Sequence, residues 1–394
     1  MKKLNGKNRV VTLLRKAAYS RVELARATGL GKSALTKVTK ALFDEGIIEE
    51  AQVAVKQSSE QGRGRPETLL QLVPNIKFSL CFYLTKQGVS SYLIDFTGKI
   101  HAVNEVDWPV DPANHEIHVA YSTDVLLDIV KQEANVLCAQ QSLTLDQLEL
   151  ISIATFGKVS QQDGIVVHSQ FFQDTNVKLA EIIGDCLGVT TKIFNVNYCC
   201  AFQLQQMYPE KESFISLCLG LGLGLGLCLD GQLVTGRLGS TLGIGHVNYE
   251  PNGKKCYCGA KGCTEAYVTS DAIIDEIESL RGLSISGNDV SDKMQSIKQL
   301  LASGDVAAHR SIEKVSQAVG DILAQLMVTF DISTIFMSGD TAVLFHYLEQ
   351  YIRQYLTSDK RYQTLLTKPQ IIRVTDVKAS VGGLIQLTNS QIMI

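Results

Sequence analysis

CYCGAKGCTE, residues 256–265, places three cysteines within eight positions, and His246 lies ten residues before the first of them. Three thiolates and one imidazole fill all four positions of a tetrahedral zinc ion, which is the arrangement of a structural site. Two glycines allow this loop to fold tightly enough for the sulfur atoms to face one ion. Incidental buried cysteines are the alternative. The sequence predicts a structural Zn2+ that shapes the loop rather than activating water, with the ligands His246, Cys256, Cys258 and Cys263.

Strands and helices alternate on both sides of this loop, from about residue 76 onward. Apolar patterning predicts strands at residues 78–84, 89–95, 99–103, 150–155, 191–194, 214–229 and 334–338. An amphipathic helix is expected at residues 309–330, directly before the last of these strands. The pattern indicates an α/β body of about 320 residues, most simply divided into two lobes.

Glycines occupy every second position of the segment GLGLGLG, residues 220–226. Such a row leaves one face of a strand without side chains, so that another group can approach the backbone closely. A phosphate or a sugar is one candidate for that group. Tight packing of the protein backbone is the favoured alternative, because the intervening residues are all leucine and none is a hydroxyl or lysine.

The first 72 residues differ from the body and predict three helices followed by a β-hairpin. Val10, Leu13, Leu14 and Ala17 have core spacing in the first helix. The second helix opens with a capping box formed by Ser20 and Glu23 and stops at Gly29. The third covers about residues 32–45, with Leu35, Val38 and Leu42 on its apolar face.

Charge is distributed unevenly between this head and the body. Residues 1–66 hold 14 of the 37 lysines and arginines but 6 of the 40 acidic residues, a balance of +8, which leaves -11 for the remainder. A solvated charged surface is the alternative, but a basic head on an acidic body indicates a polyanion partner for the head.

Helix-turn-helix geometry is compatible with Ala25, Gly29 and Leu35, which supply a small residue, a glycine turn and an apolar anchor. The same spacing also occurs in small helical bundles. The polar face of the third helix is what a recognition helix presents to the major groove of double-stranded DNA. The candidate DNA-binding residues on this face are Lys32, Ser33, Thr36, Lys37 and Lys40.

A wing is expected between a strand at residues 47–55 and its partner at residues 69–73. The intervening QGRGRP, residues 61–66, is similar to the AT-hook core, in which an extended backbone inserts two arginines into a narrow A/T-rich minor groove. Arg63 and Arg65 are therefore candidate DNA contacts. A flexible basic linker is the alternative.

The composition excludes several classes of protein. With 394 residues, 45% apolar and 20% charged, the chain is neither disordered nor fibrous. The longest apolar run, residues 214–229, has 16 residues and is too short for a membrane helix. No apolar signal segment follows the basic N-terminus, so we expect a cytoplasmic protein without membrane insertion.

These motifs resemble the ROK family of repressors, open reading frames and kinases, and within it the sugar-responsive Mlc and NagC repressors. The resemblance covers nearly the whole chain and rests on the basic head, the glycine-rich segment, Gly245-His246 and the cysteine motif ending at Glu265. It implies a winged helix-turn-helix at residues 1–72 and a two-lobed, actin-like sugar-kinase body. The first lobe is expected at 76–194, completed by about 375–394, and the second, with the zinc loop and oligomerisation helices, at 195–374. It also implies a homodimer or homotetramer that binds a palindromic, A/T-flanked operator.

Departures from the family pattern argue against kinase activity. Residues 82–86 read FYLTK where kinases carry the ATP-binding Asp-x-Gly-Gly-Thr, and Leu221 replaces a threonine of the glycine-rich segment. Val196 stands where the family has the aspartate that accepts the proton of the sugar hydroxyl. Since valine cannot accept a proton, general-base catalysis is lost. We therefore expect that the protein is not an enzyme. If it were one, a sugar kinase would be the alternative.

The ligand site implied by the resemblance is degenerate. Gly157, Asn195, His246 and Glu265 remain at sugar-contacting positions, but Gly243 replaces a second carboxylate. The alternatives are that Asn195 is a turn residue, Glu265 caps a helix and His246 serves only zinc. We expect a repressor of sugar transport or catabolism genes, controlled by a sugar, a sugar phosphate or a phosphotransfer-system protein. A protein-interaction module with a vestigial sugar site is the remaining alternative.

Overall fold

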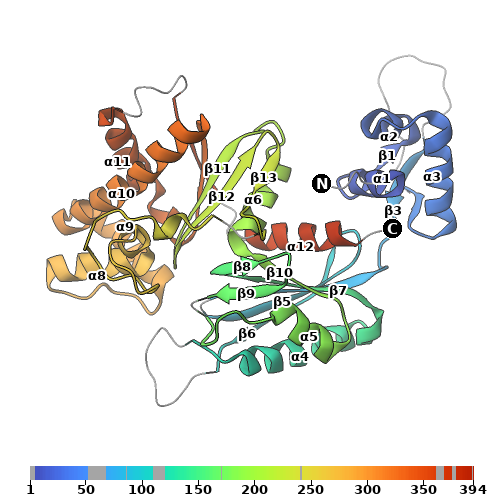
Figure 1. Ribbon diagram of the computed structural model, residues 1–394, viewed down its shortest axis with the longest axis horizontal. Coiled ribbons are helices and arrows are strands. Elements are labelled where there is room, and N and C mark those ends of the chain that lie inside the picture. Colours follow the sequence, from blue (N-terminus) through green and yellow to red (C-terminus); the bar gives the residue numbers. More distant parts are fainter. Residues whose placement is uncertain are drawn as a thin grey trace.

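The computed structural model describes residues 5–51, 68–85, 87–109, 120–169, 171–239, 242–360, 368–374, 379–392 and 394. Figure 1 shows a small head that contains helices α1 to α3 and two larger lobes, each built around a sheet. Within the described residues, no helix is both long enough and apolar enough to span a bilayer.

The head contains the three predicted helices, α1 (Gly6–Leu14), α2 (Arg21–Thr28) and α3 (Lys32–Asp44). Ser20 and Glu23 form the predicted capping box, and Gly29 ends α2 in the left-handed conformation with φ 70°. The prediction that Ala17 belongs to the first helix and its core is wrong. Helix α1 ends at Leu14, and Ala17 is exposed because the chain there turns toward the next strand.

A three-stranded antiparallel sheet completes the head, in the order β1 (Tyr19–Ser20), β3 (Leu69–Leu72) and β2 (Ile48–Glu50). The predicted pairing of the last two strands is confirmed. The tip of the predicted wing, with Arg63 and Arg65, lies outside the described residues.

The first lobe contains a five-stranded sheet in the order β10-β7-β4-β5-β6. Its strands are β4 (Phe78–Leu84), β5 (Gly88–Ile94), β6 (Ile100–Asp107), β7 (Leu148–Thr155) and β10 (Thr191–Asn195). Strands β4 to β6 form the predicted antiparallel meander, although β6 is longer than expected. Helices α4 (Thr123–Gln140) and α5 (Leu179–Leu187) cover one face, and α12 (Ala379–Gln391) covers the other. A two-stranded hairpin of β8 (Lys158–Ser160) and β9 (Ile165–His168) follows β7.

The second lobe contains a five-stranded sheet in the order β13-β12-β11-β14-β15. Its strands are β11 (Phe214–Leu219), β12 (Leu223–Leu229), β13 (Gln232–Val234), β14 (Thr334–Ser338) and β15 (Gln370–Arg373). The expectation of strand throughout 214–229 needs correction, because residues 220–222 are a turn that folds the segment into a hairpin. The helices of this lobe are α7 (Glu265–Val268), α8 (Ser270–Arg281), α9 (Val290–Ala302), α10 (Val306–Phe330) and α11 (Phe345–Ser358).

Helix α6 (Val196–Met207) packs against both lobes, because it contacts α12 on one side and β12 on the other. Gly383 allows the close approach of α12, since a Cβ there would overlap with the carbonyl oxygen of Cys199. The far end of α12 reaches the head, where Ile392 is buried in the head's core. Figure 1 shows α12 between the lobes, with the C-terminus beside the head.

Candidate metal centre, cleft and basic helix

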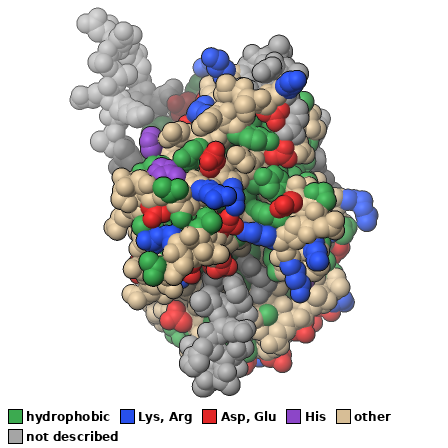
Figure 2. Space-filling view, turned by 90° about the vertical axis from the view of Figure 1, so that its left-hand side faces the viewer, with side chains coloured by type: hydrophobic (Ala, Val, Ile, Leu, Met, Phe, Trp, Pro, Cys, Tyr) green, Lys and Arg blue, Asp and Glu red, His purple; other side chains and the backbone are tan. Residues whose placement is uncertain are grey.

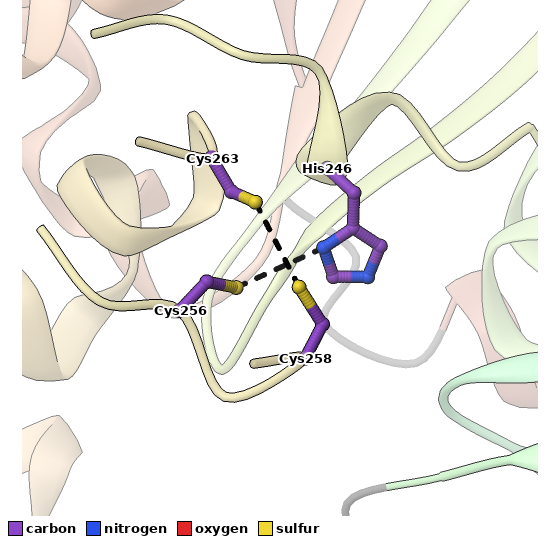
Figure 3. Close-up of side chains that lie close together, drawn as sticks. All are labelled: His246, Cys256, Cys258 and Cys263. Atoms are coloured by element: carbon purple, nitrogen blue, oxygen red, sulfur yellow. Dashed lines mark hydrogen bonds between the residues drawn. The ribbon is translucent and has the colours of Figure 1, made fainter. Parts of the chain in front are cut away.

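The predicted metal ligands converge in the structure (Figure 3). His246 lies at the end of the 3₁₀ helix η2 (Ile244–His246), and the three cysteines lie in the loop before α7. Both Cys256 Sγ to His246 Nδ1 and Cys258 Sγ to Cys263 Sγ measure 3.8 Å. A tetrahedral ion with bonds of about 2.3 Å to sulfur sets its ligand atoms about 3.8 Å apart. The donor set and its spacing therefore fit one tetrahedral zinc ion.

The segment from His246 to Cys263, the metal loop, has a backbone that explains how the four side chains come together. The Cys256 N–H donates to the Ala260 carbonyl at 2.8 Å, which closes the turn between the first two cysteines and the third. Gly262 has φ 81°, and a Cβ there would overlap with the carbonyl oxygen of Glu250. A hydrogen bond from the Ala260 N–H lowers the pKa of the Cys258 thiol, which favours the thiolate that metals bind.

Glu265 lies beside the candidate metal ligands and is 7% exposed. Its Oε1 accepts a hydrogen bond from the Leu223 N–H at 3.2 Å, and its Oε2 lies 3.5 Å from His246 Nδ1. Burial raises the pKa of Glu265 to about 7. Glu265 begins α7, but its carboxylate turns toward β12. This contact does not support the alternative that it caps its own helix.

Asn195 holds the junction between β10 and α6. As the N-cap of α6, its Oδ1 accepts from the Asn197 N–H at 2.7 Å, while its Nδ2 donates to the Gly157 carbonyl at 2.6 Å. Both ends of the amide are therefore occupied within the protein. This arrangement supports the structural alternative for Asn195, and it brings Gly157 next to it.

A cavity of about 1070 Å³, the cleft, lies between the lobes. All four residues of the predicted ligand site line it: Gly157, Asn195, His246 and Glu265. Val196 and Gly243 also line it, so both positions at which the sequence has lost a carboxylate face this space. Sequence reasoning missed several other lining residues, among them Lys158, His168, Asn197, Tyr257, Asp340 and Arg373. Of these, Tyr257 carried a signal, because it stands between Cys256 and Cys258, two of the candidate metal ligands.

The glycine-rich segment is packed against side chains of the protein. A Cβ at Gly224 would overlap with the side chain of Asn197, and one at Gly226 would lie 2.5 Å from Ala201 Cβ. A Cβ at Gly222 would overlap with Glu265 Oε1. The packing interpretation is supported at these three positions, since α6 and Glu265 occupy the space beside them. Gly220, Gly222 and Gly224 also line the cavity between the lobes.

The five predicted DNA contacts on α3 form an exposed face opposite the buried Leu35 and Leu42. The exposed residues are Lys32, Ser33, Thr36, Lys37 and Lys40. The Thr36 hydroxyl donates its one proton to the Lys32 carbonyl at 2.9 Å. Its oxygen is therefore left to accept a hydrogen bond from a binding partner. Arg63 and Arg65 cannot be placed beside this face, because they lie outside the described residues.

Comparison with known proteins gives consistent results. A family model described as "ROK family" matches residues 113–387. The chain is 25% identical to the DNA-binding transcriptional repressor Mlc of Escherichia coli (strain K12) over 347 residues, which cover 85% of this chain and 81% of Mlc. It is 24% identical to the DNA-binding transcriptional dual regulator NagC of the same organism over 327 residues, which cover 82% of this chain and 76% of NagC.

Solved structures show the same fold. A ROK family transcriptional regulator, described as a homolog of the E. coli Mlc protein, matches with a TM-score of 0.74 at 22% identity and covers 98% of this chain and 96% of its own. A ROK family glucokinase from Streptomyces griseus, solved with glucose and AMPPNP, matches with a TM-score of 0.61 at 18% identity. The glucokinase match covers 79% of this chain and 99% of the kinase.

Proposed function

The chain belongs to the ROK family, and we propose that it is a DNA-binding transcriptional regulator that represses genes of sugar transport or catabolism. The observation that carries this proposal is the exposed polar face of α3, with three lysines, on a head whose charge balance is +8. Similarity to the Mlc repressor and the NagC dual regulator over more than four fifths of the chain supports it.

The head is proposed to be a winged helix-turn-helix of residues 1–72. Helix α3 would read base edges in the major groove, while Arg63 and Arg65 would enter the flanking minor groove. Figure 2, which views the molecule over α8 to α11, shows lysine and arginine side chains interspersed with acidic ones.

The metal is proposed to be a structural Zn2+ held by His246, Cys256, Cys258 and Cys263. Because protein atoms fill all four positions, the ion would supply no Lewis-acid site for a substrate. Its role would be to hold the loop that forms one wall of the cleft. The Glu265 carboxylate lies outside the ligand set, with Oε2 3.5 Å from His246 Nδ1, and its negative charge would favour the bound cation when it is ionised.

We propose that kinase activity is lost, and the residues that line the cleft support this. Val196 and Gly243 provide no carboxylate where proton abstraction and sugar recognition would need one. We propose that the cleft receives a sugar or sugar phosphate as a regulatory signal. Control by a phosphotransfer-system protein is the second candidate, and the two hydrogen bonds that the Asn195 amide makes within the protein favour it, because they leave fewer of its groups for a sugar.

We place the domain boundaries at 1–72, at 76–194 completed by about 375–394, and at 195–374. The protein would act in the cytoplasm as a homodimer or homotetramer that brings two heads to a palindromic operator. A signal in the cleft would change the spacing of the heads relative to half-sites one or more helical turns apart.

Fluorescence anisotropy with labelled duplex DNA tests this function. The logarithm of the binding constant should fall linearly with the logarithm of salt concentration. The double variant Lys37→Ala/Lys40→Ala should weaken binding and reduce that slope by about 2. The matched control Lys298→Ala/Lys360→Ala removes two exposed lysines of the second lobe and should change neither quantity. Equal effects of the two variants would contradict DNA binding through α3.

A further inference from the structure

We propose that Tyr257 latches the β8–β9 hairpin of the first lobe onto the metal loop of the second lobe, so that the metal fixes the width of the cleft. The proposal rests on the metal site proposed above. It extends that site from local support of one loop to a contact between the lobes.

The first observation is the position of the Tyr257 ring. It stacks on the ring of His168 in β9, with a centroid distance of 5.9 Å and an interplanar angle of 21°. It also meets the edge of the His246 ring at 5.5 Å and 68°. Both distances lie in the range that aromatic pairs prefer. Tyr257 therefore contacts a histidine of each lobe.

The second observation concerns the two nitrogens of His246. Its Nδ1 faces Cys256 Sγ within the ligand cluster, and its Nε2 lies 3.4 Å from the Tyr257 hydroxyl. A metal at Nδ1 leaves the ring proton on Nε2, which can then donate to that hydroxyl. Metal binding would thus fix the imidazole that holds Tyr257 in its contact with His168.

The third observation is a second anchor at the tip of the same hairpin. Gln161 Nε2 donates to the Gly239 carbonyl at 2.6 Å, and the Gln162 N–H donates to the Leu238 carbonyl at 3.4 Å. Leu238 and Gly239 follow β13 of the second lobe in the sequence. The β8–β9 hairpin is therefore attached to the second lobe at two points, of which one depends on the metal loop.

Both partners of the latch also form the cavity wall. Lys158 and His168 line it from the hairpin, and His246 and Tyr257 line it from the metal loop. Separation of the two lobes by hinge motion would pull these pairs apart, as in other two-lobed proteins that close around ligands. Breaking the latch should therefore loosen the hairpin without unfolding either sheet.

Hydrogen–deuterium exchange of the full-length, metal-loaded protein tests the latch. Tyr257→Ala should raise the exchange rates of residues 158–168 by roughly two- to tenfold. Tyr257→Phe keeps the stacked ring but removes the hydroxyl that accepts from His246 Nε2, so its exchange rates should lie between those of the wild type and Tyr257→Ala. The matched control is Tyr347→Ala, because Tyr347 contacts His309 at 5.9 Å within the second lobe. It should leave the hairpin unchanged.

A second variant separates the latch from the metal. His168→Ala removes the first-lobe partner and leaves every metal ligand in place, so it should loosen the hairpin while metal content, measured by colorimetric release, stays at the wild-type level. Chelation of the metal should reproduce the hairpin effect of Tyr257→Ala. Unchanged hairpin exchange in His168→Ala would overturn the proposal. A wild-type protein that binds no zinc would instead refute the metal site.

Discussion

The backbone N–H of Ile394 donates a hydrogen bond of 3.1 Å to Oδ1 of Asn8, so the last residue of the chain is joined to the first helix. Asn5 Nδ2 returns a bond of 3.4 Å to the Ile394 carbonyl. Helix α12 (Ala379–Gln391) comes shortly before Ile394 in the sequence, and Ala379 and Ser380 at its N-terminal end line the cleft. One helix thus connects the cleft to the head, which supports a regulator whose head responds to the body.

The connection between head and body also involves the turn after β5. Phe96 lies beneath the guanidinium of Arg15 at 4.5 Å and belongs to the head's core, although it comes from the first lobe. Burial lowers the pKa of Arg15 to about 10. The neighbouring Asp95 accepts hydrogen bonds from the Asn75 and Thr97 N–H groups and from the Thr97 hydroxyl.

Asp95 should make stability depend on acid pH. Burial alone would raise its pKa, but hydrogen bonds from Thr97, the Asn75 N–H and His101 outweigh burial and lower it. A lowered folded-state pKa contributes stability above the unfolded-state value near 4 and loses it as pH falls through the folded-state value. Denaturant unfolding between pH 7 and 3 should show this loss. Asp95→Asn should flatten the acid limb, whereas Asp128→Asn, an exposed residue of α4, should not.

The metal should stabilise the protein. Chelation or Cys258→Ser should lower the free energy of unfolding by about 3 kcal/mol or more, as expected for a ligand present at 100 times its dissociation constant. Calorimetry and metal analysis of the same samples measure this. Cys186→Ser, at an exposed cysteine of α5 outside the cluster, should keep both metal and stability. Equal stability with and without metal would argue against a structural ion.

Arg63 and Arg65 should contribute to DNA affinity. Arg63→Ala/Arg65→Ala should weaken binding to A/T-flanked duplexes and reduce the salt slope, because two charges leave the phosphate-lined groove. Gel-shift titrations at several salt concentrations measure both effects. If affinity and slope match the wild type, the wing does not contact DNA.

At Gly243, a substitution can restore the protein carboxylate that binds sugar hydroxyls in family members. A Cβ there meets nothing within 4 Å, so a side chain fits. A hydrogen bond to a charged acceptor contributes about 1.5–3 kcal/mol, so Gly243→Glu should tighten binding of neutral hexoses roughly tenfold or more. Calorimetric titration with hexoses and hexose phosphates measures this, with Gly243→Gln as the uncharged control. Identical affinities of the two variants would show that this position does not contact sugar.

Local pattern sufficed to predict the elements whose residues are neighbours in sequence. The candidate metal ligands lie within eighteen positions, from His246 to Cys263, and the capping box of α2 spans four. The turn between β11 and β12 was harder to predict, because leucine and glycine alternate through it and the pattern does not show where β11 ends. Ala17 continued the apolar spacing of α1 beyond the point where the helix ends.

Contacts between distant segments could not be predicted from such patterns. His168 and Tyr257 come from different lobes, and no periodicity relates them. Likewise, Ile392 is buried among head residues because the whole body folds α12 back to the N-terminus. The family resemblance supplied the cleft, whereas the contacts that join the cleft to the metal loop and to the head required the structure.

Genome-wide crosslinking and sequencing of the DNA bound by the tagged protein in its own host tests the regulator function most directly. We expect discrete, A/T-flanked palindromes upstream of sugar transport or catabolic genes, lost in Lys37→Ala/Lys40→Ala and retained in Lys298→Ala/Lys360→Ala. No enriched sites in cells where the wild-type protein is abundant would contradict sequence-specific DNA binding by the head.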